Sequence, residues 1–182
     1  MMRDEQRRQV YAAEDLAGEG TALSEPRTVE FLTRSTEALC RGRWWRVDLG
    51  CGAVDIALNR SEQRSYFSPL TRVISLSPQA CDLGTLTHEL AHAAAFDTDG
   101  YEPLHGPHFR TLHVQVRRAM LGTRCAADLL AVYRQFGLAT MNAQSVVPSG
   151  SVLPTELYLQ ERIAGRPPGH HTSRRPGPPI AL

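Results

Sequence analysis

The segment His88-Glu89-Leu90-Ala91-His92 holds two imidazoles four residues apart, with a carboxylate next to the first. In a helix, residues at this spacing lie one turn apart on the same face, so both imidazoles can bind one metal ion. Zinc–nitrogen contacts are about 2.0–2.1 Å long. Glu89 could reach a water molecule on that metal without becoming a ligand, which is where a general base must lie. The spacing predicts a helical metal site with His88 and His92 as ligands and Glu89 as the catalytic base.

A catalytic zinc site needs a third protein ligand and an open position for water. Downstream, His105 precedes Gly106 and Pro107. We expect Gly106 to permit a sharp turn and Pro107 to begin a helix, so that His105 is held on a rigid corner. His105 is therefore the favoured third ligand.

Other side chains that follow the second histidine are alternative third ligands. His108 is the main alternative, and the loop carboxylates rank below it: Asp97, Asp99 and Glu102. The residue six positions after His92 is Thr98, which excludes the ligand spacing of the metzincins.

The elements that must position these residues are predicted from hydrophobic periodicity. Apolar side chains at three- and four-residue steps predict helices at 3–17, 26–40, 82–96, 107–121 and 125–136. Short segments rich in β-branched or aromatic residues predict strands at 44–49, 53–58 and 72–77. We therefore expect an α+β fold with a small, mainly antiparallel sheet, in which 72–77 is an edge or near-edge strand beside the active-site helix. A further short helix is expected near 155–163.

Composition limits the classes of function. The chain has 182 residues, 42% of them hydrophobic, which suits one globular domain. Its net charge of only +1 disfavours a dedicated nucleic-acid-binding protein. All 20 basic residues are arginine, so lysine chemistry is excluded. The adjacent Trp44 and Trp45 would point to opposite faces of a strand, and we expect them to be mainly core residues.

Composition also divides the chain. We expect an N-terminal helix at 1–24, the main domain at 25–137, a connector at 138–164, and a disordered tail at 165–182 with five prolines and three glycines. The N-terminus is charged, no apolar stretch suits a signal peptide or membrane helix, and the four cysteines form no CxxC pair. These features predict a cytoplasmic protein with reduced thiols.

HELAH followed by HGPHF resembles the SprT-like zinc metallopeptidases, whose pattern is HExxH, a variable loop, then HGxxF. The resemblance covers about residues 72–120. It implies a zincin-like fold, a zinc ion held by His88, His92 and His105, and Glu89 as the catalytic acid/base. The opening RDEQRRQVYAAED also resembles the start of a family of uncharacterised metallohydrolases of actinobacteria and their phages.

Together these features predict a zinc-dependent hydrolase, most specifically a peptidase acting on a protein or peptide substrate. Zinc-bound water, activated by Glu89, would attack the scissile carbonyl. Candidate oxyanion stabilisers are Tyr101, His108, His113 and Tyr133.

The alternative function is a metal-stabilised binding protein with little or no hydrolysis. It would dock on a partner or on DNA through the arginine pairs Arg117-Arg118 and Arg174-Arg175. No membrane partner is expected.

Overall fold

Five α-helices and three short strands form the part of the computed structural model that is described, residues 6–61, 63–99 and 105–141. The helices are α1 (Arg7–Gly18), α2 (Val29–Arg41), α3 (Leu83–Asp99), α4 (Pro107–Leu121) and α5 (Thr123–Gln135). The strands are β1 (Asp55–Leu58), β2 (Tyr66–Ser68) and β3 (Val73–Leu76). The predicted α+β class is confirmed for these residues.

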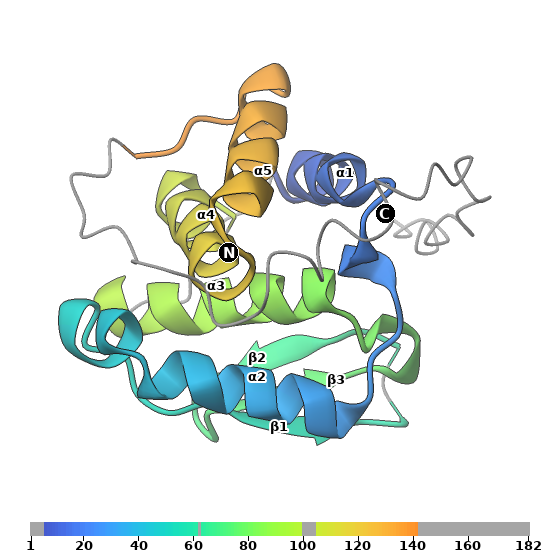
Figure 1. Ribbon diagram of the computed structural model, residues 1–182, viewed down its shortest axis with the longest axis vertical. Coiled ribbons are helices and arrows are strands. Elements are labelled where there is room, and N and C mark those ends of the chain that lie inside the picture. Colours follow the sequence, from blue (N-terminus) through green and yellow to red (C-terminus); the bar gives the residue numbers. More distant parts are fainter. Residues whose placement is uncertain (1–5, 62, 100–104, 142–182) are drawn as a thin grey trace, which may run out of the picture.

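Helix α3, which carries the HExxH segment, is the central element. Figure 1 shows it crossing the middle of the molecule, with the sheet and α2 on one side and α1, α4 and α5 on the other. Leu86, Leu90, Ala91 and Ala95 lie on different sides of α3 and are all fully buried. A helix that is apolar all round belongs in a core. Helix α3 therefore has packing partners in two layers.

The three strands form a mixed sheet in the order β1-β3-β2. Strand β3 pairs parallel with β1, through Ile56 opposite Ile74, and antiparallel with β2, through Phe67 opposite Ile74. The expectation of a mainly antiparallel sheet with 72–77 near its edge is therefore corrected: β3 is central and β2 is an edge strand. The three residues of β2 are too few to give a pattern that the sequence could reveal.

The tryptophan pair lies in a π-helical turn, Trp44–Asp48, and not in a strand. Both indoles are buried, and the Trp45 Nε1–H donates a hydrogen bond to the Gly52 carbonyl at 2.8 Å. A strand would send the two rings to opposite faces, whereas this turn keeps both in the core. The core expectation for the pair is confirmed, and the strand prediction for 44–49 is wrong.

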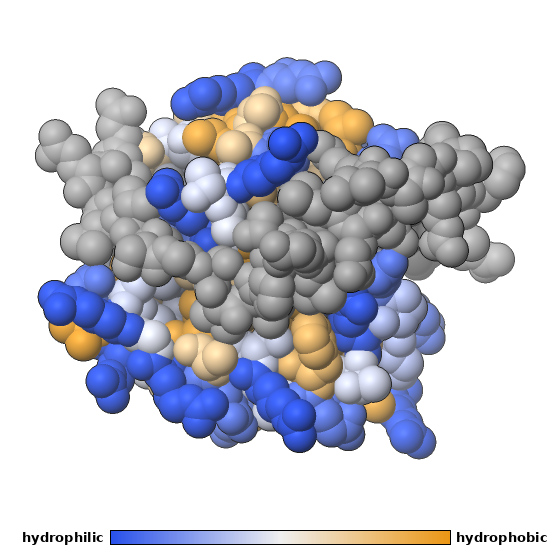
Figure 2. Space-filling view, viewed as in Figure 1, coloured by the Kyte–Doolittle hydropathy of each residue, from blue (hydrophilic) through white to orange (hydrophobic). Residues whose placement is uncertain are grey.

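Helix α2 covers β1 and turns a charged face outward. Its N-terminus is Thr28, whose hydroxyl accepts a hydrogen bond from the Phe31 N–H at 3.2 Å, so the helix begins after Pro26 and not at it. Figure 2 shows hydrophilic side chains over most of the region where α2 lies. The exposed side chains of α2 are Glu30, Arg34, Glu37 and Arg41.

The other helix boundaries follow the predicted stop signals closely. Helix α4 begins at Pro107 and ends before Gly122, whose φ of 92° is the conformation that favours glycine. The predicted helix at 155–163 and the predicted disordered tail at 165–182 lie outside the described residues. Within the described ranges, no helix is long and apolar enough to cross a membrane.

One ion pair fixes the sheet against α3. The guanidinium of Arg72, just before β3, contacts both carboxylate oxygens of Asp97 on α3 at 2.6 and 2.7 Å. Arg72 Nε also donates to the Ala53 carbonyl at 2.9 Å, and Asp97 accepts from the Gly52 N–H at 3.0 Å. Three segments distant in sequence are therefore joined at the end of the site helix.

Candidate metal centre

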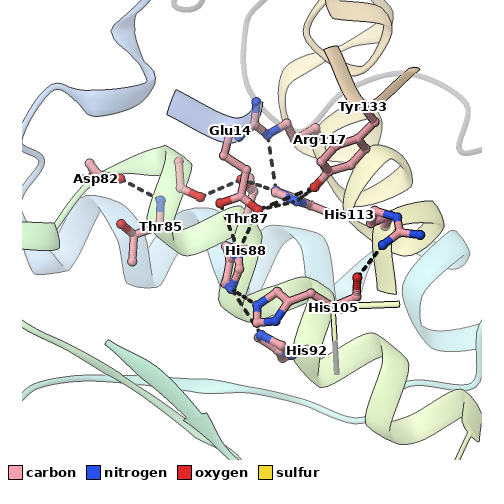
Figure 3. Close-up of polar contacts among 12 residues, drawn as sticks. Glu14, Asp82, Thr85, Thr87, His88, His92, His105, His113, Arg117 and Tyr133 are labelled. Carbon is pink, nitrogen blue, oxygen red and sulfur yellow. Dashed lines mark hydrogen bonds and ion pairs between the residues drawn. The ribbon is translucent and has the colours of Figure 1, made fainter. Parts of the chain in front are cut away.

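Three imidazoles converge between α3 and the start of α4 (Figure 3). The Nε2 atoms of His92 and His105 each lie 3.1 Å from the Nε2 atom of His88. A tetrahedral zinc ion with contacts of about 2.05 Å separates its ligand nitrogens by about 3.3 Å. The three side chains therefore fit a zinc ion, and their ligand atoms all lie within 4.8 Å of one another.

A hydrogen bond to its main-chain carbonyl holds His105 in place. Its carbonyl accepts a hydrogen bond of 2.6 Å from Arg110 Nη1, which also donates to Gln6 Oε1 at 2.6 Å. Pro107 occupies the first turn of α4, as predicted. Gly106 has a φ of −75° and an extended ψ, which any residue adopts, so our reason for a glycine there was wrong.

Phe109 lies against all three imidazoles. Its ring centroid is 5.1 Å from that of His88, 4.5 Å from that of His92 and 4.9 Å from that of His105, and the side chain is fully buried. Because Phe109 lies only four residues after His105, one corner of the chain supplies both an imidazole and the apolar side chain that packs against the other two.

Glu89 directly follows His88 in α3. In the part of the chain that the structure describes, its carboxylate belongs to no group of side chains that could hold a metal ion together. Its Oε2 atom accepts a hydrogen bond of 2.9 Å from the Phe67 N–H on β2. The side chain is buried, and burial raises the pKa of its carboxyl above the ordinary value. The carboxylate is thus positioned between the site helix and the sheet edge.

The model of the SprT-like family matches residues 31–130, which is more than half of the chain. The chain belongs to the SprT-like family. No curated protein and no solved structure matches it.

The matched part of this SprT-like chain runs from α2 into α5 and contains all three converging histidines. Helix α1 lies before it. The family membership is consistent with a zincin-like metallopeptidase. The similarity to metallohydrolases of actinobacteria and their phages stays a prediction.

Two residues that sequence reasoning missed come from α1. The Tyr11 ring stacks on His88, with centroids 5.1 Å apart and planes inclined by 20°. The Glu14 carboxylate contacts His88 Nδ1, at 2.8 Å from Oε1 and 3.1 Å from Oε2. No sequence motif joins Glu14 to a histidine 74 residues later, so only the packing of α1 reveals the contact.

Behind His88, a buried polar cluster surrounds Glu14. His113 Nδ1 lies 3.3 Å from Glu14 Oε1 and 2.9 Å from the Tyr133 hydroxyl. Burial lowers the pKa of His113 to about 4, so its imidazole is neutral at pH 7. Burial acts to raise the pKa of Glu14, but the facing His88 and His113 outweigh it and hold that pKa well below the usual range. Glu14 is therefore an ionised carboxylate in a buried site.

The alternative ligands lie elsewhere or are not described. His108 Nε2 is 2.8 Å from the Thr98 hydroxyl, and Asp97 is engaged by Arg72. The structure thus brings His105, and not His108, to the α3 pair. The loop residues Tyr101 and Glu102, and the side chain of Asp99, are outside the described part.

The positions of His113, Tyr133 and Arg117 bear on two further expectations. His113 and Tyr133 contact Glu14 behind His88 and do not face the point where the three Nε2 atoms converge, so they are not placed to stabilise an oxyanion. Arg117 is 1% exposed and directs Nε at His113 Nε2 over 3.3 Å. Arg117 is therefore unavailable to a DNA phosphate, because its guanidinium is enclosed in the protein.

Proposed function

We propose that this chain is a zinc-dependent hydrolase, most specifically a peptidase. The observation that carries the proposal is the convergence of three histidine Nε2 atoms beside a buried carboxylate that is not part of the ligand group. Three nitrogen ligands leave one position of a tetrahedral zinc ion open, as in catalytic rather than structural sites. Membership of the SprT-like family supports the same class of activity.

His88, His92 and His105 would hold the ion. When bound, zinc supplies a Lewis acid that polarises a carbonyl group and lowers the pKa of water to about 7. The buried environment strengthens this effect, because electrostatic interactions are weakly screened where water is excluded. Phe109 and Tyr11 pack against the imidazoles and limit their movement.

Glu89 would act as the general base and then as the general acid. Its carboxylate accepts a proton from the attacking water and later delivers it to the leaving amine. The raised pKa, which burial causes, makes the carboxylate a stronger proton acceptor than an exposed glutamate. This role needs the carboxylate near the reacting atoms but outside the ligand group, as it lies here.

Strand β2 supports a peptide as the substrate. The Phe67 N–H points away from β3 toward Glu89, so in an antiparallel ladder the Phe67 carbonyl points to the same outer side. An extended peptide could add to this edge through main-chain hydrogen bonds. Pairing would replace the Phe67–Glu89 hydrogen bond and release the Glu89 carboxylate for proton transfer. Tyr66, 43% exposed on β2, is available to contact such a peptide.

The test compares Glu89→Gln with the wild type and with Glu37→Gln, an exposed substitution of the same kind on α2. Both variants should bind about one zinc ion per chain. Glu89→Gln should lose about 10²–10⁴-fold in hydrolysis of unfolded protein substrates, tested with and without DNA, while Glu37→Gln keeps full activity. Equal activity in the wild type and Glu89→Gln would refute the base assignment. Zinc binding without hydrolysis by the wild type would favour the metal-stabilised binding protein.

A further inference from the structure

Helix α1 presents one face to the metal centre from outside the part of the chain that matches the SprT-like family. Tyr11 and Glu14 are three residues apart, so they lie on the same side of this helix. Tyr11 stacks on the His88 ring, and Glu14 contacts Nδ1 of the same ring. Two side chains of one helix therefore act on a single ligand histidine.

The Glu14 contact determines which nitrogen of His88 carries the proton. Both oxygens of the Glu14 carboxylate lie within 3.1 Å of His88 Nδ1, and Oε1 also accepts from the Tyr133 hydroxyl. Glu14 is therefore the acceptor in this contact, and the proton lies on His88 Nδ1. In the neutral imidazole, Nε2 then carries the lone pair. That atom is the one that lies 3.1 Å from the Nε2 atoms of His92 and His105. The contact thus prepares His88 for a metal ion on its other side.

The carboxylate is itself fixed by donors from two other helices (Figure 3). Arg117 Nε can only donate, so His113 Nε2 accepts and the His113 proton lies on Nδ1, facing Glu14 and Tyr133. The Tyr133 hydroxyl donates to Glu14 Oε1 at 3.5 Å. The Glu14 side chain is only 10% exposed, and His113 and Tyr133 are fully buried. These contacts from two helices restrict the movement of the Glu14 carboxylate.

We propose that Glu14 is the positioning residue of the metal centre, and that α1 is a working part of the site. This inference rests on the proposed zinc ligands. A carboxylate behind a ligand histidine fixes the ring, selects the tautomer and increases the basicity of the ligating nitrogen. His113 and Tyr133 hold the carboxylate in place.

A second arrangement of the same residues makes a different prediction. Glu14, His88 and His113 each offer a ligand atom within 4.8 Å of the others, so they could hold a second metal ion. In that case Nδ1 of both histidines would have to lose its proton. The 2.8 Å between His88 Nδ1 and Glu14 Oε1 suits a hydrogen bond and is shorter than the about 3.3 Å that separates two ligand atoms of one zinc ion, which favours the positioning role. The experiments separate the two arrangements.

The first experiment uses the unaltered, metal-free protein. Nitrogen-15 NMR of the imidazoles, with His88 assigned by comparison with His88→Gln, reports which ring nitrogen is protonated. We expect the proton on Nδ1 of His88. A proton on Nε2 would overturn the proposal, and this measurement does not depend on whether a Glu14 variant folds.

The second experiment measures metal binding by Glu14→Gln. The amide has nearly the same shape as the carboxylate but no charge. Glu19→Gln, at an exposed position directly after the end of the same helix, is the matched control. We expect zinc binding to be about 10–100-fold weaker in Glu14→Gln, measured against a chromophoric chelator. The control should bind zinc as tightly as the wild type. The visible spectrum of the cobalt(II)-substituted protein should also change in Glu14→Gln alone, because that spectrum reports ligand geometry.

Other outcomes identify what has failed. Wild-type affinity and an unchanged cobalt spectrum in Glu14→Gln would overturn the positioning role. Two metal ions in the wild type and one in Glu14→Gln would show that Glu14 is a ligand instead. If His105→Ala does not abolish zinc binding, the proposed function fails and this inference fails with it. If His105→Ala does abolish it and Glu14→Gln has no effect, only this inference fails.

Discussion

Replacing Phe109 with alanine tests whether the aromatic wall holds the ligand histidines. The side chain is fully buried, and truncating a buried phenylalanine costs about 3–5 kcal/mol of stability. The ring also contacts His88, His92 and His105, so its loss should loosen all three imidazoles. Met120→Ala is the control, because Met120 is fully buried on the same helix but lies three turns away. Its truncation costs about 2–5 kcal/mol without a contact to the histidines.

The assay is urea unfolding with and without zinc. At a free zinc concentration 100 times Kd, binding stabilises the native protein by about 2.7 kcal/mol. If the loss of the ring weakens zinc binding about tenfold, the gain at the same concentration falls to about 1.4 kcal/mol. Met120→Ala should keep the full gain. An equal gain from zinc in Phe109→Ala and Met120→Ala would refute the reasoning. Phe109→Leu replaces Phe109→Ala if the latter does not fold.

Two further predictions concern the third ligand and the ion pair behind the site. His105→Ala should abolish stoichiometric zinc binding, whereas His108→Ala should leave it intact, as metal analysis of the purified variants would show; the opposite pattern would make His108 the ligand. Asp97→Asn should lower the free energy of unfolding by about 1–3 kcal/mol, because it removes a charge-assisted contact to Arg72, which is 30% exposed. The matched Glu37→Gln, in an exposed pair, should change it by no more than about 0.5 kcal/mol, and a similar effect of both in urea unfolding would count against the Asp97 prediction.

The fold was predicted well where local signals are strong. Helices α4 and α5 follow an apolar repeat and end near glycines with positive φ, Gly122 and Gly137, so their positions could be read from the sequence. The prediction failed at Trp44 and Trp45, where β propensity favoured a strand. Burial of both indoles in a π-helical turn overrides that propensity, and burial depends on elements remote in sequence.

By itself, the sequence determined which side chains could form the centre. His88 and His92 are joined by helix geometry, since a four-residue step returns to the same face, and Glu89 directly follows the first of them. His105 and Phe109 are four residues apart in the segment where α4 begins, so they are close in space whatever the rest of the fold. These relations hold within one or two turns of chain and need no knowledge of the rest of the fold.

The surroundings of that centre depend on how distant segments of the chain pack. The Phe67 N–H reaches Glu89 because β2 is an edge strand, and Glu14 reaches His88 because α1 packs on α5. Both contacts join segments far apart in the chain, and their geometry depends on how helices and strands pack as layers. Hydrophobic burial drives that packing without direction, so no local pattern encodes which polar atoms it brings together.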